Sequence, residues 1–248
     1  MQLAPLSDHC KAIILGSLLG DGSLKIAKLY KNARFSFRHS ISQKSYFMWK
    51  MNELKEISSE KCFWKQGENG KDGWGKEKFR YQSLALESLT KLYQLTNKRG
   101  RLRIRRKWLN MLTPLSLAIW WLDDGSLVSD SRQGVFCTDG FPLKEIMLLR
   151  NYLKKVWSIA TAIGKIKRGP KEYYRLWIRS TEELKEFLRI ILPHIPVEDM
   201  LPKVIMLYKD SKLQQRWISE LSNLTKFSRE TIEKYMLQKR TKWKHFRE

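Results

Sequence analysis

Cysteines, histidines and long apolar runs are scarce in this 248-residue sequence. Its three cysteines, Cys10, Cys62 and Cys137, are odd in number and widely spaced, which excludes a disulfide framework and a Cys-based zinc site. No stretch is apolar for long enough to cross a bilayer, and the N-terminus lacks the features of a signal peptide. We therefore expect a soluble, intracellular protein with no membrane partner.

Acidic residues are also few compared with basic ones. The chain has 48 Lys and Arg against 25 Asp and Glu, a formal charge of +23. An excess of this size predicts a polyanionic partner, with nucleic acid the leading choice. The alternative is a surface of solvated lysines. The length fits one large domain or two small ones.

The sequence repeats its own order of elements. The stretch "LLGDGSL" ends at Leu24, and "WLDDGSL" ends at Leu127. After each, alternating and helical patterns predict strands and helices in the same order, so each half reads as helix, two strands, helix, two strands, helix. The fold class is therefore α+β. We expect halves at 1–97 and 114–209, a basic linker at 98–113 and a C-terminal extension at 210–248.

The expected elements can be placed from periodicity and turn residues. In the first half they are a strand over 34–41, a helix over 42–57, the strand "KCFWKQG", a Gly-rich turn over Gly67–Gly75, the strand "KFRYQSL" and the helix "ALESLTKLYQL". In the second half they are "GVFCTD", a helix over 142–159, "AIGKIKRG", a turn at Gly169-Pro170, "EYYRLWI" and the helix "STEELKEFLRIIL". The linker holds seven basic residues in ten over 98–107, either as solvated charge or as a phosphate-contacting segment.

The repeated motif has features of a helix contact and of a metal site. Gly16 and Gly20 are four residues apart on one helix face, where they permit close approach of a second helix, which we expect to be "LSLAIWWLDDGSL". If the two helices are parallel, Asp21 and Asp124 emerge together at their ends. Paired carboxylates favour a bound cation, and oxygen ligands suit Mg²⁺. An Asp-Gly turn is the alternative for a single copy; two matched copies in a basic protein favour metal-assisted phosphodiester hydrolysis.

These residues resemble a known family. "ILGSLLGDG" and "LAIWWLDDG" are similar to the two signature motifs of single-chain, pseudo-symmetric LAGLIDADG homing endonucleases, and the resemblance extends to about residue 209. It implies a monomer of two αββαββα halves, whose four-stranded antiparallel sheets form a DNA-binding saddle with the motif helices at the interface. Such enzymes cut both strands of a long, nearly asymmetric double-stranded DNA target and leave short 3′ overhangs. Because they are usually encoded within introns or inteins, we expect a bacterial cytoplasm or an organelle.

The resemblance also implies the residues of the active site. Asp21 and Asp124 would be catalytic and would bind metal together with Gly20 and Asp123, with Mg²⁺ or Mn²⁺ as cofactor and Ca²⁺ as an ion that binds without supporting cleavage. Lys203 in "IPVEDMLPKV" matches a family lysine, whereas Arg101 in "KRGRLRI" stands where a lysine is usual. An arginine stays charged and cannot act as a base.

Alternation along the strands predicts which side chains face DNA. Phe35, Phe37 and Ile41 point to the helices, and acidic residues are nearly absent from the opposite face. Long polar side chains there suit contacts with base edges and phosphates. The expected DNA-binding residues are Lys25, Lys28, Arg34, Ser36, Arg38, Ser40, Arg80, Gln82, Lys165, Lys167, Tyr173, Arg175, Trp177 and Arg179.

The C-terminal extension lies outside the repeat. Within "WISELSNLTKFSRETIEKYM" the apolar spacing predicts two helices, with Ser228 as N-cap of the second, followed by the basic tail "KRTKWKHFRE". The pair is either a DNA-binding helix-turn-helix or a structural cover for the second half.

Two other functions remain open on this scaffold: a maturase that binds intron RNA, and a DNA-binding regulator that does not cut.

Overall fold

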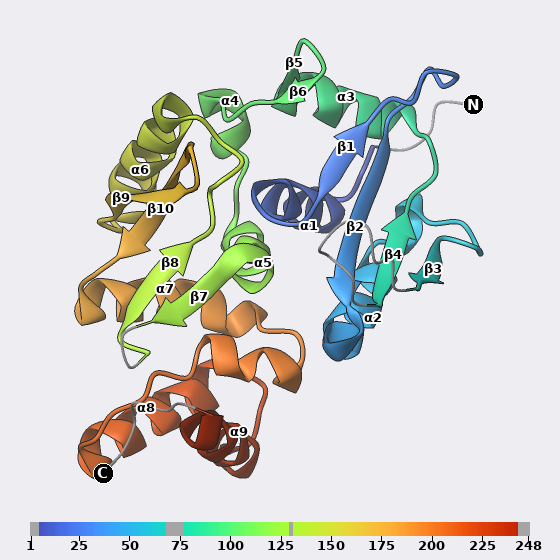
Figure 1. Ribbon diagram of the computed structural model, residues 1–248. Coiled ribbons are helices and arrows are strands. Elements are labelled where there is room, and N and C mark those ends of the chain that lie inside the picture. The colour runs from blue at the N-terminus through green and yellow to red at the C-terminus, as the bar shows by residue number, and fades with distance from the viewer. Residues whose placement is uncertain (1–4, 68–76, 129–130, 243–248) are drawn as a thin grey trace. The chain divides into compact units, whose positions relative to one another are not determined.

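A computed structural model describes residues 5–67, 77–128 and 131–242. The chain forms two compact units, Met1–Asp123 and Asp124–Glu248, which are considered separately below (Figure 1). Most of the expected Gly-rich turn over 67–75 and the end of the basic tail, 243–248, lie outside the described residues. No helix in the described ranges is long and apolar enough to cross a membrane.

The first unit has one four-stranded antiparallel sheet with helices on its buried face. The strands follow the order β1-β2-β4-β3, with β1 at Ser23–Lys25, β2 at Arg34–Ser40, β3 at Phe63–Gln66 and β4 at Lys78–Gln82. The helices are α1 (Asp8–Leu19), α2 (Lys44–Glu53), α3 (Glu87–Thr96) and α4 (Arg106–Leu109), with 3-10 turns η1 (Ile41–Gln43) and η2 (Lys55–Ile57) around α2. The strand and helix order is the one that periodicity predicts.

The first motif helix, α1, packs against α5 (Pro114–Asp124), which carries the second motif. A Cβ added to Gly16 would lie 2.3 Å from the carbonyl oxygen of Ser116, and one added to Gly20 would lie 2.5 Å from the Cβ of Asp123. Since both contacts advance in the same direction along the chain, the helices are parallel. The spacing of Gly16 and Gly20 predicts this close approach.

The residues expected to form a linker are ordered locally. They include the short antiparallel pair β5 (Asn97–Lys98) and β6 (Arg101–Leu102) and the helix α4. Trp108 and Leu109 of α4 are fully buried, and the guanidinium of Arg105 donates to backbone carbonyls at the end of α3, including that of Gln94. This stretch is thus packed on the first unit by burial and by hydrogen bonds to otherwise unpaired helix carbonyls.

The second unit repeats the sheet of the first. Its strand order is β7-β8-β10-β9, with β7 at Gly125–Val128, β8 at Gln133–Phe136, β9 at Ala162–Arg168 and β10 at Lys171–Ile178. The turn between β9 and β10 is Gly169-Pro170, where Gly169 has a φ of +58° that favours glycine. The helices are α6 (Leu143–Trp157) and α7 (Thr181–Ile191), followed by the 3-10 segments η3 (Leu192–His194) and η4 (Glu198–Lys203).

The C-terminal extension consists of α8 (Ser211–Leu224) and α9 (Arg229–Lys242). Trp217, Ile218 and Leu221 of α8 are buried, as are Ile232 and Met236 of α9. The expected N-cap of the second helix is present, because the Ser228 Oγ accepts a bond from the amide of Thr231 at 3.3 Å. In the second unit α9 packs against both α8 and η4.

The contact between α1 and α5 gives a stability prediction. We expect Gly16→Ala to lower the free energy of unfolding by about 1 to 3 kcal/mol, because the added methyl group would overlap the Ser116 backbone, which cannot move aside like a side-chain end. Denaturant unfolding measures the change. Gly140→Ala is the control, since a Cβ there meets no atom within 4 Å in the described structure. Equal unfolding midpoints for the two variants would contradict the close helix contact.

Candidate active site

Asp21 is fixed by a tight turn at the end of α1. The amides of Gly20 and Gly22 both donate to the carbonyl of Ser17, at 2.9 and 2.6 Å. A Cβ on Gly22 would lie 2.8 Å from the backbone of Ser17, so the turn requires glycine at this position. The Asp21 side chain remains 40% exposed. The Gly-Asp-Gly sequence therefore places a partly solvated carboxylate at the helix end.

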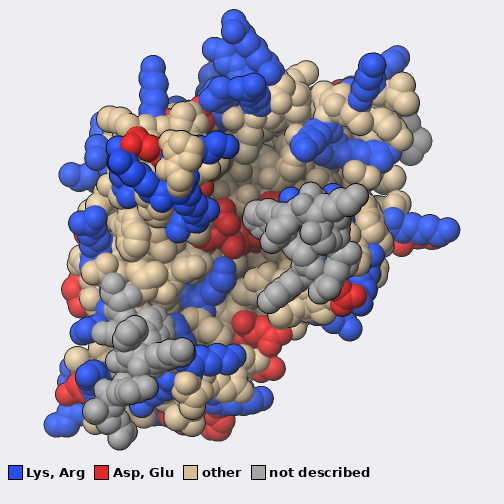
Figure 2. Space-filling view, in the orientation of Figure 1, with Lys and Arg blue, Asp and Glu red and all other residues tan. Residues whose placement is uncertain are grey.

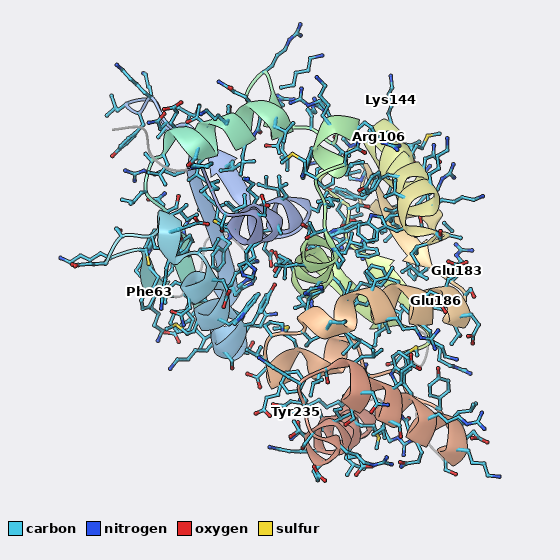
Figure 3. The ribbon with its side chains drawn as sticks, turned by 180° about the vertical axis from the view of Figure 1, so that it is seen from behind. Phe63, Arg106, Lys144, Glu183, Glu186 and Tyr235 are labelled. Atoms are coloured by element: carbon cyan, nitrogen blue, oxygen red, sulfur yellow. The ribbon has the colours of Figure 1, made fainter. Side chains whose placement is uncertain are left out.

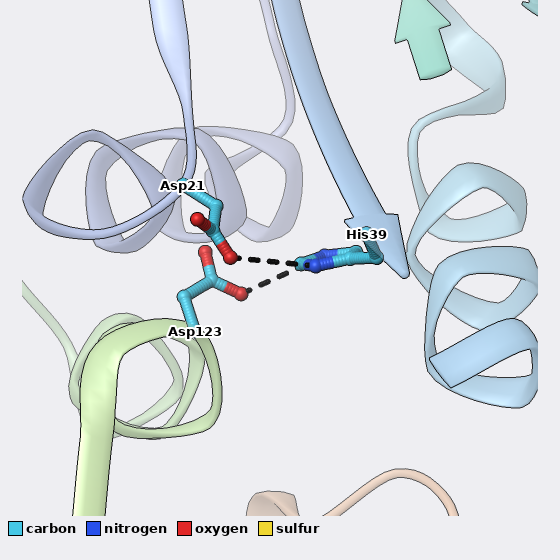
Figure 4. Close-up of side chains that lie close together, drawn as sticks. All are labelled: Asp21, His39 and Asp123. Atoms are coloured by element: carbon cyan, nitrogen blue, oxygen red, sulfur yellow. Dashed lines mark ion pairs between the residues drawn. The ribbon is translucent and has the colours of Figure 1, made fainter. Parts of the chain in front are cut away.

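Asp21 lies close to a buried histidine and a second aspartate (Figure 4). The Nδ1 of His39 is 3.4 Å from an Asp21 oxygen, and its Nε2 is 3.8 Å from an Asp123 oxygen. The His39 side chain is 1% exposed, and among the described residues neither ring nitrogen has a hydrogen-bond partner. One ligand atom from each residue lies within 4.8 Å of the others. This group in the described first unit has the donors and the spacing to hold a metal ion.

Asp123 has a second set of contacts that changes its role. Both of its oxygens lie 2.8 Å from the Lys50 ammonium, and one also accepts from the Tyr46 hydroxyl at 2.9 Å. Neither the Lys50 nor the Asp123 side chain has exposed surface. The ammonium also lies 4.9 Å from the Phe37 ring and 5.2 Å from the Tyr46 ring. The charge of Asp123 is thus compensated inside the protein.

The surroundings keep Tyr46 as a proton donor. Burial raises the pKa of the Tyr46 hydroxyl well above its usual value, and the charge of Asp123 and the hydrogen bond to it raise it further. A divalent ion bound directly to Asp123 would lie beside the buried Lys50 ammonium, where charge repulsion is weakly screened. The contacts therefore favour Asp123 as the counter-ion of Lys50 and leave Asp21 and His39 as the more available ligands.

Sequence reasoning missed His39, although the signal was present. Burial alternates along β2, so that Phe35, Phe37 and His39 face the core while Arg38 is exposed. The same alternation that assigns the two phenylalanines to the helix side assigns His39 to it as well. Its closeness to Asp21 follows from the pairing of β2 with β1, which begins two residues after Asp21.

The second unit has a different residue at the corresponding place. Ser23 pairs with Ser36 in the first sheet and Ser126 pairs with Val135 in the second, so Thr138 is the counterpart of His39. Thr138 is fully buried and its hydroxyl donates to the Tyr174 carbonyl at 2.6 Å. The two halves share a fold, but they differ chemically beside the motif aspartate.

Asp124, at the end of α5, lies near the family-matched lysine of the second unit. The amide of Cys137 donates to the Asp124 carbonyl at 3.1 Å. Burial raises the pKa of the Cys137 thiol; the charge of Arg175 lowers this pKa, that of Asp124 raises it and that of Lys203 lowers it. Lys203 ends η4, which packs against β7. The second unit therefore brings Asp124 and Lys203 to one region, whereas Arg101 is an exposed residue of β6 in the first unit.

Arg175 is held by a carboxylate that the sequence pattern did not reveal. Its Nε and Nη2 each donate to Asp139 at 2.7 Å. The hydrogen bond from Arg175 lowers the pKa of the Asp139 carboxyl. Lys165 has a similar partner in Glu172, at 2.5 Å. Two of the expected DNA-binding residues of the second unit, Arg175 and Lys165, are therefore each paired with a carboxylate.

The predicted DNA-binding face of the first unit carries basic side chains next to polar and aromatic groups. Arg38 is exposed, and Arg34 contacts Gln82 at 3.2 Å and lies 4.2 Å from the Tyr30 ring. The Arg80 guanidinium lies 5.7 Å from the Trp64 ring. Figure 2 shows Lys and Arg side chains over much of the visible surface of each unit. Aromatic rings beside guanidinium groups suit contact with bases as well as with phosphates.

Comparison with known proteins identifies the family. Residues 11–187 match the model of the LAGLIDADG DNA endonuclease family. The chain belongs to this family. The matched region contains most of α1, all of α5, both four-stranded sheets and His39.

Individual relatives are similar over most of this chain. Protein RecA of Mycobacterium gastri is 29% identical over 204 residues, which cover 77% of this chain and 46% of the relative. Cytochrome b mRNA maturase bI2 of Saccharomyces cerevisiae (strain ATCC 204508 / S288c) is 27% identical over 203 residues, covering 78% of this chain and 47% of the relative. The chain thus spans about half the length of these curated relatives.

A solved structure has the same fold. It is the homing endonuclease I-WcaI bound to its DNA recognition sequence, which is 22% identical to this chain. The similarity covers 84% of this chain and 90% of that one, with a TM-score of 0.72. At this identity the match supports the two-sheet α+β fold and not the assignment of individual residues.

The buried Lys50–Asp123 pair gives a second stability prediction. We expect Lys50→Met to lower the free energy of unfolding by about 3 to 5 kcal/mol, because it leaves the Asp123 carboxylate buried without its cation. Lys50→Met combined with Asp123→Asn should recover much of this loss. Denaturant unfolding of the single and double variants measures the coupling.

The control is Lys91→Met, which breaks an exposed pair with Glu87 on α3. Its effect should stay within about 1 kcal/mol. If Lys50→Met were as mild as Lys91→Met, the Asp123 charge would not depend on Lys50.

Proposed function

We propose that this protein is a site-specific endonuclease that hydrolyses phosphodiester bonds of double-stranded DNA with the help of a divalent metal ion. The observation that carries the proposal is the partly exposed Asp21 carboxylate at the end of a motif helix. It lies 3.4 Å from a buried histidine whose ring nitrogens have no hydrogen-bond partner among the described residues. Family membership gives this geometry its expected chemistry. Mg²⁺ or Mn²⁺ is the proposed cofactor, and Ca²⁺ is expected to bind without supporting cleavage.

The residues of the first unit fit such an ion. Asp21 would hold it, with His39 as the nearest further donor, and the cation would lower the pKa of a bound water and neutralise phosphate charge. Asp123 would keep Lys50 neutralised, so that the ammonium does not repel a cation at Asp21. Gly20 permits the close approach of α5 that brings Asp123 to this position.

The second unit would serve the other DNA strand. Asp124 would hold metal there, and Lys203 would supply positive charge for the phosphate. The difference between His39 and Thr138 predicts that the two strands are cut at different rates. Cutting that leaves short 3′ overhangs at a long, nearly asymmetric site is the outcome expected from the family resemblance.

The charge of the chain supports DNA as the partner. The formal charge is +23, and exposed basic side chains such as Arg38 lie on the outer face of the first sheet. Two motif halves in one chain make a monomer the expected active species. Binding should weaken as salt rises, since Lys and Arg displace counterions from the duplex.

Intron RNA is a second candidate partner. The observation that favours it is the similarity to a protein named as a cytochrome b mRNA maturase. A maturase would use similar basic surfaces. A DNA-binding regulator that does not cut is less well supported, because both motif aspartates are present. Splicing assays with the flanking intron and cleavage assays on its intron-less junction separate these functions.

The motif aspartates give the cleavage prediction. Asp21→Asn or Asp124→Asn should abolish double-strand cutting and leave DNA affinity within about tenfold, because each carboxylate would hold metal rather than DNA. Nicking of one strand can remain. Cleavage of a supercoiled plasmid carrying the target, together with a binding titration, measures both properties.

The matched control is Asp8→Asn, an exposed change at the start of α1. It should cut like the unaltered protein. Full Mg²⁺-dependent double-strand cutting by Asp21→Asn would rule out the proposed role of Asp21.

Two arginines among the expected DNA-binding residues should respond differently to removal. Arg38→Ala should relax base preference by about 1 to 3 kcal/mol and leave the melting temperature unchanged, since Arg38 is exposed. Arg175→Ala should lower the melting temperature as well, because it leaves Asp139 without its bidentate partner. Binding to a panel of target variants and a thermal melt give both values. Equal melts for the two variants would show that the Arg175–Asp139 pair adds no stability.

A further inference from the structure

The segment that carries Lys203 has buried backbone groups that need hydrogen-bond partners. It continues beyond η4 through Tyr208 without regular secondary structure, and the residues 204–208 are all buried. Backbone groups removed from water require partners, and a segment outside helices and sheets has no ladder to supply them. Side chains from elsewhere in the second unit must therefore supply the bonds.

Lys239 of α9 supplies two of these bonds. Its ammonium donates to the carbonyl of Pro202 at 2.6 Å and to that of Ile205 at 2.7 Å. These two carbonyls lie on either side of Lys203 in the chain. Burial lowers the pKa of Lys239 to about 7, so the lysine is held at a cost in desolvation. A single side chain thus binds the backbone before and after the family-matched lysine.

The helix α8 provides further bonds to the same segment. The Trp217 indole donates to the Val204 carbonyl at 3.3 Å. The Gln214 amide donates to the Met206 carbonyl at 3.2 Å and accepts from the Tyr208 amide at 2.9 Å. Gln214 is itself buried, at 2% exposure. Because residues 204–208 are buried, water does not take the place of these hydrogen bonds.

Tyr235 binds the beginning of η4. Its hydroxyl donates to the Asp199 carboxylate at 2.8 Å, and it projects from the same helix as Lys239, one turn earlier (Figure 3). The η4 segment is therefore fastened to α9 near both of its ends. Side chains of α8 and α9 thus make hydrogen bonds to residues along the whole of 199–208. A helix pair that served only to bind DNA would not need these bonds.

We propose that the C-terminal extension positions Lys203 for phosphodiester cleavage, with Lys239 as the principal positioning residue. This inference rests on the proposed function, because Lys203 is expected to act only if the protein cuts DNA. Lys239 acts through the backbone that it holds and does not reach the substrate. Removal of its ammonium would leave the Pro202 and Ile205 carbonyls buried without these donors. The backbone at Lys203 would then no longer be held in one position.

The experiment measures cleavage of each DNA strand separately. A duplex carrying different labels on its two strands is cut by the unaltered protein, Lys203→Met, Lys239→Met and the double variant. Lys239→Met should slow the same strand as Lys203→Met, by about tenfold to a hundredfold, since small misplacement of a catalytic group has effects of this order. It should leave the other strand and the DNA dissociation constant unchanged, and it should add nothing in the Lys203→Met background.

Two further measurements guard against simple unfolding. Tyr235→Phe removes one bond from η4 and should give a smaller slowing of the same strand at an unchanged melting temperature. Hydrogen exchange should show loss of protection confined to 198–208 in Lys239→Met. Lys242→Met, an exposed change on the same helix, is the control and should match the unaltered protein in exchange and strand bias.

The outcomes separate the two proposals. Equal slowing of both strands, or a further loss when Lys239→Met is added to Lys203→Met, would overturn the positioning role. Unchanged exchange over 198–208 in Lys239→Met would also overturn it. If the unaltered protein cuts neither strand of its intron-less junction, the proposed nuclease function fails, while the exchange data still decide whether Lys239 holds the segment.

Discussion

The close approach of α1 and α5 is the constraint on which the first active site depends. With no side chain at Gly16 and Gly20, the helix backbones can come near enough for Asp123 to lie against the end of α1. At that depth the Asp123 carboxylate is out of water, and it is stable there because Lys50 and Tyr46 supply three short hydrogen bonds. The close contact of the two helices thus buries a carboxylate that needs its hydrogen bonds from Lys50 and Tyr46. Asp21, which follows Gly20 in the chain and is partly exposed, is the carboxylate that we propose as the metal ligand.

This arrangement explains why the two motifs are not copies of each other. The first motif has Gly20 where the second has Asp123, and these two residues face each other across the helix contact. A second aspartate at position 20 would overlap Asp123 and add like charge. The asymmetry continues in the sheets, where His39 and Thr138 occupy equivalent positions. One fold therefore carries chemically different residues beside its two motif aspartates.

The order of elements could be predicted because alternation and helical spacing depend on neighbouring residues. The strand around Phe35 and the turn at Gly169-Pro170 are examples. The Lys50–Asp123 pair could not, because the two residues are distant in sequence and nothing local requires a lysine on a buried helix face. Arg175 was expected to face DNA, and its partner Asp139 was missed because their meeting depends on the β8–β10 register. Alternation along β2 predicts that the His39 side chain faces the core, but it does not predict that this side chain lies next to Asp21.

The C-terminal extension shows a similar limit of sequence reasoning. Apolar spacing predicts its two helices and the Ser228 cap correctly. It does not reveal that Lys239 faces inward, because a lysine in a basic tail reads as a solvated or DNA-binding charge. The bonds from Lys239 to the carbonyls around Lys203 link the extension to the η4 segment of the second unit. The DNA-binding role of the helix pair stays a separate prediction.

The central claim is that Asp21 binds metal while Asp123 stays with Lys50. The most direct test is a crystal structure of the protein with its DNA target and Mn²⁺, in which anomalous scattering locates the ion. The account predicts Mn²⁺ bound to Asp21, with the Asp123 carboxylate still within hydrogen-bond distance of the Lys50 ammonium. Mn²⁺ coordinated by Asp123, with Lys50 displaced from it, would contradict the account.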